Sequence, residues 1–346
     1  MRGVAMRTIS HCLALSILVL AVAWRCGAAS HDGTKAGGTT ELFVTNSLGD
    51  DITVIDLDTL KVIRDIKVGA GVHGLCAPAD GRRIFTTVES EHNLKSIDTA
   101  SGRILSTISL SGRPNQCAAT PDGRFVAVPI RDGNSVEIVD MTLNRVVKTL
   151  PIKIPHNCFN AGSNTSLFVS SMGSDEVDLI DLKKMDYAEK IPVGGVPRPY
   201  AVSNDQKTMY VALSDFHGFA IVSIPERKVV RRVELPSAPP SKCVLEPHTP
   251  THGLALSPDG RELWVTSLGD NGVYVYSLAT KKVSRKIAVG SCPNWIALSP
   301  DGRYCAVSNS GSDDCSIIDT RTEREAARIK VGHGPKRVLA VRVPAP

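Results

Sequence analysis

Seven polar residues recur at a nearly constant spacing, and their side chains could bind a metal ion or an anion. Successive members lie 42, 41, 42, 54, 42 and 42 residues apart, and the column consists of His73, Asn115, His156, Arg198, His252, Asn294 and Lys336. Imidazole is the commonest protein ligand of transition metals, whereas arginine and lysine bind carboxylates and phosphates. None of the seven is acidic, so a hard oxygen-ligated ion is not expected here.

Two further columns show the same period, which identifies a structural repeat of about forty residues. The apolar column is Phe43, Phe85, Ala127, Phe168, Tyr210, Trp264 and Ala306, and the polar column is Asp56, Asp98, Asp140, Asp181, Ser223, Ser277 and Asp319. Each repeat contains four short strand-like runs separated by turns such as Pro300-Asp301-Gly302. We expect the aspartates of the polar column to cap turns rather than to catalyse a reaction. Four strands per repeat are typical of a β-propeller blade.

The number of repeats predicts an all-β fold, a seven-bladed β-propeller of four-stranded blades over residues 41–346. The chain enters at Glu41 with the second strand of a blade, and the tail from Pro335 to Val343 supplies one strand with nothing after it. Pairing the two ends would complete the first blade and leave no exposed sheet edge.

The repeats resemble a known family. The strings Leu42-Phe43-Val44-Thr45-Asn46 and Leu263-Trp264-Val265-Thr266-Ser267, followed by Ile-Asp and Val-Gly pairs, are similar to the YVTN β-propeller repeat. The resemblance covers residues 41–343 and implies the fold, which is similar to that of cytochrome d1-type and nitrous oxide reductase-type propellers. Proteins with such repeats include exported binding and surface proteins, but the resemblance implies little about activity.

Residues 1–29 are interpreted as a signal peptide. Arg2 and Arg7 precede an apolar run over residues 12–24, and Gly27-Ala28-Ala29 provides small residues for cleavage. The alternatives are an uncleaved anchor, for which the run is short, and a lipoprotein attached at Cys26, for which Trp24 and Arg25 are unsuitable neighbours. Residues 30–40 are expected to form a flexible leader.

The predicted mature chain is nearly neutral. Loss of Arg2, Arg7 and Arg25 changes the formal net charge from +5 to +2, because 5 − 3 = 2. Such a charge gives no reason to expect a nucleic acid partner. We therefore expect a periplasmic or extracellular monomer, without a transmembrane anchor after cleavage, whose partner is a small ligand or a protein.

Cysteines provide a second indication of the compartment, since exported proteins can keep disulfides. Cys243 and Cys292 are the best candidate pair, because both precede innermost strands of neighbouring blades. Cys76, Cys117 and Cys158 lie within innermost strands and are expected to be small buried residues.

The polar column should face the central channel and supports two functional hypotheses. In the favoured one, a histidine-rich, weakly cationic and acid-free channel mouth binds a small anion, a peptide or a partner protein, through Asn115, Arg198, Asn294, Lys336 and Arg337. A bland alternative is that these residues only line a water-filled channel. A hydrolase of the kind that uses channel carboxylates is disfavoured, because the column has none.

In the second hypothesis, His73, His156 and His252 converge with His248 on a transition metal such as copper, which could support redox chemistry. The segment from Glu246 to Gly253 resembles histidine-bearing segments of nitrous oxide reductase propellers. The resemblance is incomplete, because no cupredoxin domain adjoins the repeats. Whether the protein is an enzyme stays open at this point, and binding without catalysis is favoured.

Overall fold

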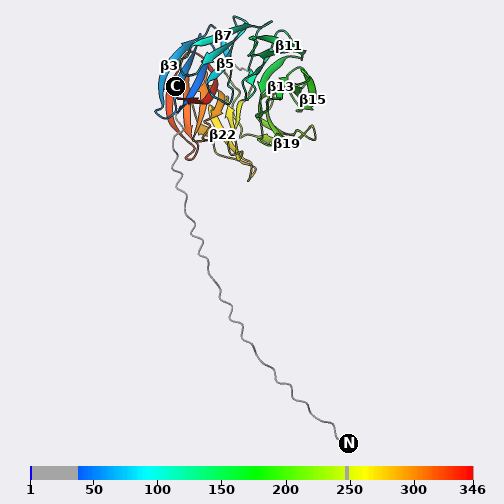
Figure 1. Cartoon of the computed structure of the whole chain (residues 1–346). Helices are drawn as coiled ribbons and strands as arrows, with labels where there is room; N and C mark the ends of the chain where they lie inside the picture. Colours follow the sequence, from blue (N-terminus) through cyan, green and yellow to red (C-terminus); the bar gives the residue numbers. More distant parts are fainter. Residues whose placement is uncertain (2–37, 246–248, 346) are drawn as a thin grey trace. The chain divides into compact units, whose positions relative to one another are not determined.

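The computed structural model describes Met1, residues 38–245 and residues 249–345. The proposed signal peptide, most of the leader and His248 lie outside the described residues. The described residues form seven antiparallel sheets, which are the blades of a propeller (Figure 1). The region that the innermost strands surround is called the channel. No helix in this part of the chain is long and apolar enough to span a membrane.

Each blade is described from its innermost to its outermost strand. The first blade contains β29 (Pro335–Pro344), β1 (Gly38–Asn46), β2 (Asp51–Asp56) and β3 (Lys61–Lys67). The second contains β4 (Val72–Cys76), β5 (Arg83–Val88), β6 (Asn93–Asp98) and β7 (Ile104–Ser109), and the third β8 (Ala118–Ala119), β9 (Phe125–Ile130), β10 (Ser135–Asp140) and β11 (Arg145–Pro151).

The remaining blades follow in chain order. The fourth contains β12 (Pro155–Phe159), β13 (Ser166–Ser171), β14 (Glu176–Asp181) and β15 (Asp186–Pro192). The fifth contains β16 (Pro197–Val202), β17 (Thr208–Leu213), β18 (Gly218–Ser223) and β19 (Lys228–Glu234). The sixth contains β20 (Thr251–Leu256), β21 (Glu262–Ser267), β22 (Gly272–Ser277), β23 (Lys282–Val283) and β24 (Ile287–Ala288), and the seventh β25 (Pro293–Leu298), β26 (Tyr304–Asn309), β27 (Asp314–Asp319) and β28 (Arg324–Lys330).

The predicted closure of the ring is confirmed. β29, at the end of the chain, pairs with β1 from Gly38↔Pro344 to Asn46↔Pro335 and is the innermost strand of the first blade. β1 begins at Gly38, so the strand includes the last three residues of the segment expected to be a leader. The sixth blade departs from four simple strands, because β23 and β24 both pair with β22 and together replace one outer strand.

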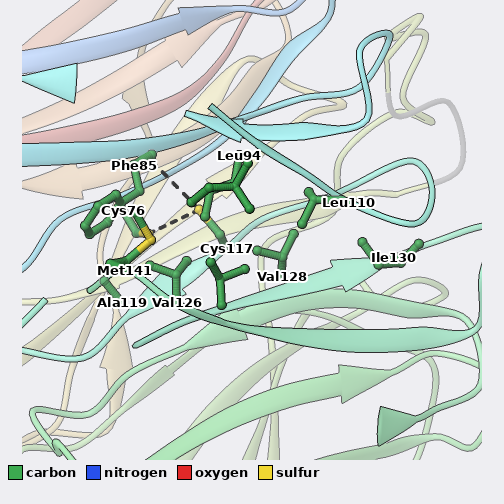
Figure 2. Packing of buried hydrophobic residues seen from close by; sticks show 12 residues of the cluster. Cys76, Phe85, Leu94, Leu110, Cys117, Ala119, Val126, Val128, Ile130 and Met141 are labelled. Carbon is green, nitrogen blue, oxygen red and sulfur yellow. Dashed lines mark hydrogen bonds between the residues drawn. The ribbon is translucent and has the colours of Figure 1, made fainter. Parts of the chain in front are cut away.

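The hydrophobic core consists of clusters between successive blades. In the cluster between the second and third blades, Phe85 of β5 packs with Cys76 and Cys117 against Val126 and Val128 of β9 (Figure 2). The inner strands are buried on both faces, whereas the outermost strands are largely exposed. Polar side chains on the inner strands therefore bond mainly to protein groups rather than to bulk solvent.

The aspartate column caps turns, as predicted. Asp98 accepts hydrogen bonds from the backbone nitrogen and the hydroxyl of Ser101, at 2.8 and 2.6 Å, and these bonds lower the pKa of its carboxyl. The equivalent carboxylates accept backbone N–H groups two or three residues onward, and these are Asp56, Asp140, Asp181 and Asp319. The capping aspartates are therefore separate from the polar column that faces the channel.

The predicted disulfide between Cys243 and Cys292 is present. It joins the connection before β20 to the connection before β25 and closes a chain separation of 49 residues. It therefore links the long connection that enters the sixth blade to the start of the seventh blade.

Asp178 is a buried carboxyl in β14 whose titration should be visible in the stability of the fold. It is 2% exposed, its Oδ1 has no hydrogen-bond partner among the described residues, and Lys190 lies opposite on β15. Burial raises the pKa of Asp178 to about 6, although Lys190 opposes this shift. The folded state therefore favours the protonated form of Asp178. This preference stabilises the fold fully below pH about 4, and the stabilisation is lost as the pH rises through about 6.

We expect Asp178→Asn to raise the free energy of unfolding by about 2–3 kcal/mol at pH 7.5 and to leave it nearly unchanged at pH 4. Urea unfolding at the two pH values measures both numbers. Asp181→Asn is the matched control in the same strand, where the carboxylate caps a turn and its pKa is lowered. A stability gain of the same size in Asp181→Asn, or none in Asp178→Asn at pH 7.5, would contradict the assignment.

Candidate functional site: the central channel

The column residues enter the channel from irregularities at the start of the innermost strands. In the second blade the register passes from Val72↔Val88 to Leu75↔Thr86, so His73 and Gly74 together oppose Thr87. Comparable register shifts are found in the first, fourth, fifth, sixth and seventh blades. A bulge re-aims side chains relative to a regular strand, which explains how a polar residue can turn inward here.

Each bulge exposes a backbone N–H, and a hydroxyl on the second strand usually accepts it. Thr87 Oγ1 accepts from Gly74 N at 2.7 Å, and the equivalent acceptors are Thr45, Ser170, Thr266 and Ser308, at 2.7–3.0 Å. Thr45 and Thr87 then donate to the carbonyls of His73 and Asn115 in the following blade. The threonine of the repeat motif thus satisfies a buried donor and joins neighbouring blades.

Two blades lack this hydroxyl, and in them the backbone N–H is either absent or bonded to another acceptor. In the fifth blade the bulge contains Pro199, which has no N–H, and the opposing residue is Ala212. In the third blade the Asn115 side chain accepts from Gln116 N at 2.8 Å. Proline and asparagine therefore replace a missing acceptor, and the position that follows the polar column is accounted for in all seven blades.

Arg337 is a buried cation that connects several blades across the channel. It is 1% exposed, and its guanidinium lies 4.0 Å from the ring centroid of Trp295. Nε donates to Gln116 Oε1 at 3.1 Å, Nη2 lies 3.1 Å from His73 Nε2, and Nη1 lies 3.5 Å from Asn294 Oδ1. The side chain therefore joins the first blade to the second, third and seventh.

His73 is held between a cation and a carboxylate. Its Nε2 faces Arg337, and its Nδ1 contacts the carboxylate of Glu89, which follows β5. Because arginine only donates, Nε2 must accept and Nδ1 carries the proton toward Glu89. The expectation of an acid-free channel mouth is therefore wrong. The polar column contains no acidic residue, but Glu89, in the connection between β5 and β6, places a carboxylate beside His73.

Arg198 and two histidines form a second group at the channel mouth. Arg198 is half-buried, its Nε donates to Ser214 Oγ at 2.8 Å, and its Nη1 lies 3.3 Å from His156 Nε2. The rings of His156 and His252 meet edge to face with centroids 6.3 Å apart, and His252 Nδ1 lies 2.8 Å from the carbonyl of Asn294. These contacts hold the Arg198 guanidinium in one orientation.

Comparison with known proteins agrees with this architecture. Residues 78–251, slightly more than half of the 346-residue chain, match the family model described as YNCE-like beta-propeller. The chain belongs to the YNCE-like beta-propeller family. No curated protein matches it.

Solved structures similar to this YNCE-like propeller support the fold alone, because their sequence identity is low. A functionally unknown protein from Desulfotomaculum acetoxidans DSM 771 has 14% identity and a TM-score of 0.71, with 88% of this chain and 99% of that chain covered. Kuenenia stuttgartiensis hydrazine synthase has 19% identity and a TM-score of 0.67, with 79% and 95% covered. Dihydro-heme d1 dehydrogenase NirN in complex with DHE has 15% identity and a TM-score of 0.63, with 88% and 74% covered.

The structure places the predicted ligand-binding residues of this YNCE-like propeller at different depths. Asn115, Asn294, Lys336 and Arg337 are buried, and the contacts of Asn115 and Arg337 described above are structural. Arg198 is the member of this predicted set that is partly exposed. An anion arriving from solvent would therefore meet Arg198 first.

The predicted metal ligands do not form a cluster in the described part of the propeller. Those residues contain no group of three or more His, Cys, Asp or Glu side chains that could hold a metal ion. His156 and His252 are neighbours. The Nδ1 atom of His73 contacts Glu89, and its Nε2 atom contacts Arg337. His248, the fourth predicted ligand, lies outside the described residues.

A feature that the sequence analysis missed is a cavity of about 390 Å³ in the other half of the channel. Residues from all seven innermost strands line it, among them Cys76, Cys117 and Cys158, and its surface is mainly apolar. The three cysteines are buried, as expected, and the Sγ atoms of Cys76 and Cys117 lie 3.1 Å apart (Figure 2). The sequence signal that could have indicated this cavity is the run of small residues along the innermost strands.

Proposed function

We propose that this YNCE-like propeller is an exported binding protein that holds a small anion, or the carboxylate of a peptide, at the channel mouth. The observation that carries the proposal is the Arg198 side chain, which is partly exposed and is oriented by Ser214 and His156. A guanidinium held in one orientation loses little conformational entropy when it forms a bidentate hydrogen bond with an oxyanion. Lys336 and Arg337 add positive charge, which Glu89 partly offsets.

Two observations support an oxidising compartment outside the cytoplasm. The segment over residues 1–29 has the composition of an export signal, and the fold contains the Cys243–Cys292 disulfide. A stable disulfide in the mature domain is typical of exported proteins, so the ligand would be met in the periplasm or outside the cell.

The copper hypothesis gains no support from the described residues, because they contain no group of three or more His, Cys, Asp or Glu side chains that could hold a metal ion and because His73 contacts Glu89. Hydrazine synthase and NirN share the fold at 19% and 15% identity, which does not transfer their chemistry to this chain. Binding without catalysis is therefore the proposed activity.

Calorimetric titration of the mature protein with phosphate, sulfate and citrate tests the proposal. We expect at least one of these anions to bind with a Kd below about 1 mM. Arg198→Gln should raise the Kd of that anion by about 10-fold to 100-fold. Arg231→Gln, which removes an exposed arginine from β19, is the matched control and should leave the Kd unchanged. The proposal fails if no anion binds this tightly, or if both variants lose the same affinity.

A further inference from the structure

The cavity opposite the histidine-rich mouth exists because the innermost strands carry small side chains at equivalent positions. Three residues after the polar column, five of the seven blades have alanine or cysteine, and these are Cys76, Ala118, Ala201, Ala255 and Ala297. Closely packed interiors have few voids larger than a water molecule. A volume of about 390 Å³ on the propeller axis therefore exceeds ordinary packing irregularity and falls within the range of small-molecule sites.

The cavity has two chemically different ends. Asn204 and Pro258, at the turns that follow the inner strands, are exposed, and the Asn204 carboxamide donates to the Pro258 carbonyl at 3.3 Å. The opposite end is formed by Gln116, Asn157 and Trp295, beneath Arg337. A ligand would therefore enter from the turn face and stop at a polar end wall.

Asn157 is one of the two amide side chains at this end wall. It is 3% exposed, lines the cavity, and its Oδ1 is buried without a hydrogen-bond partner among the described residues. Its backbone is fixed, because Asn157 N donates to Ser170 Oγ at 2.9 Å and the Tyr200 hydroxyl donates to its carbonyl at 3.3 Å. A buried acceptor without a donor is costly, and a ligand N–H or O–H would remove that cost.

We propose that the cavity is a second binding site, for a small, mainly hydrocarbon molecule with one hydrogen-bond donor that faces Asn157. The walls supply dispersion and hydrophobic contacts through Leu75, Val202, Leu254 and Ile296, and the alanines leave space for the ligand. Arg198 is not among the residues that line this cavity, so we expect binding here to be independent of anion binding at the mouth.

N-phenylnaphthylamine, an apolar fluorophore with one N–H, is the probe for the test. We expect its fluorescence to rise on addition of the mature protein with one site per chain, and phosphate to leave this signal unchanged. Indole and indene have nearly the same shape, but only indole has an N–H donor. Indole should displace the probe about fivefold more effectively than indene, which is the value of one neutral hydrogen bond.

Variants then place the probe in the cavity. Ala255→Leu and Ala297→Leu should each weaken probe binding at least tenfold, whereas Ala288→Leu, on the exposed strand β24, should not change it. Asn157→Ala should abolish the preference for indole over indene, and Arg198→Gln should affect neither compound. The proposal is wrong if the wild type does not bind the probe, if it prefers indene or neither compound, or if folded cavity variants bind normally.

Discussion

Ending the chain at Gly334, which deletes β29, is expected to abolish cooperative folding of the whole ring. β29 is the innermost strand of the first blade, and its Val338, Val341 and Val343 are buried against neighbouring strands. The deletion would leave β1 as an unpaired edge and would also remove Arg337. The free energy lost should exceed the whole free energy of unfolding of a typical domain, which is roughly 5–15 kcal/mol.

Circular dichroism melting and gel filtration measure this effect. The truncated protein should show no cooperative thermal transition and should aggregate, since its open edge can pair with other chains. A chain that ends after Pro344 is the control, because it keeps all of β29 and should melt like the full chain. A soluble truncated protein with a cooperative transition near that of the control would show that closure does not govern the fold.

Replacing Arg337 is expected to have the second largest effect. Arg337→Met should lower the free energy of unfolding by about 3 kcal/mol, because Gln116 Oε1 and His73 Nε2 would lose a donor inside the channel. Arg337→Lys should recover less than half of this loss, since a compact ammonium cannot reach several acceptors and stack on Trp295.

Urea unfolding of both variants gives these energies. Arg231→Met is the matched control on the outer strand β19 and should change stability by less than about 0.5 kcal/mol. If Arg337→Met lost less than about 1 kcal/mol, the side chain would not serve as a connection between blades.

Most of the fold could be predicted from the sequence, because each blade repeats the same arrangement of strands and turns. The apolar column that begins at Phe43 and the polar column that begins at Asp56 have the same succession of steps, which determined the number of blades, and the incomplete first repeat indicated how β29 closes the ring. Turn capping by Asp98 and Asp319 was predictable, since those hydrogen bonds join residues three positions apart.

The details of the channel were harder to predict because they depend on contacts between blades. The bulge at His73 changes which side chains point inward, so the roles of His73 and Gly74 could not be read from strand alternation. Glu89 reaches His73 from a different strand, and Arg337 reaches Gln116 across the ring. A column of polar residues therefore predicted the location of the site but not which members stay accessible.

The cavity illustrates the same limit. Cys76, Ala118 and Ala255 were each consistent with ordinary core residues, and only their arrangement around one axis produces a cavity. A search for small residues in equivalent positions of all repeats would have indicated it. Repeat proteins can thus be analysed by columns as well as along the chain.

The most direct test of the proposed function is a crystal structure of the mature protein grown with tungstate, an oxyanion with a strong anomalous signal. We predict an anomalous peak at the channel mouth, within hydrogen-bonding distance of the Arg198 guanidinium and close to His156. The same crystals of Arg198→Gln should lack that peak. Tungstate bound elsewhere on the surface, with none at Arg198, would contradict the account.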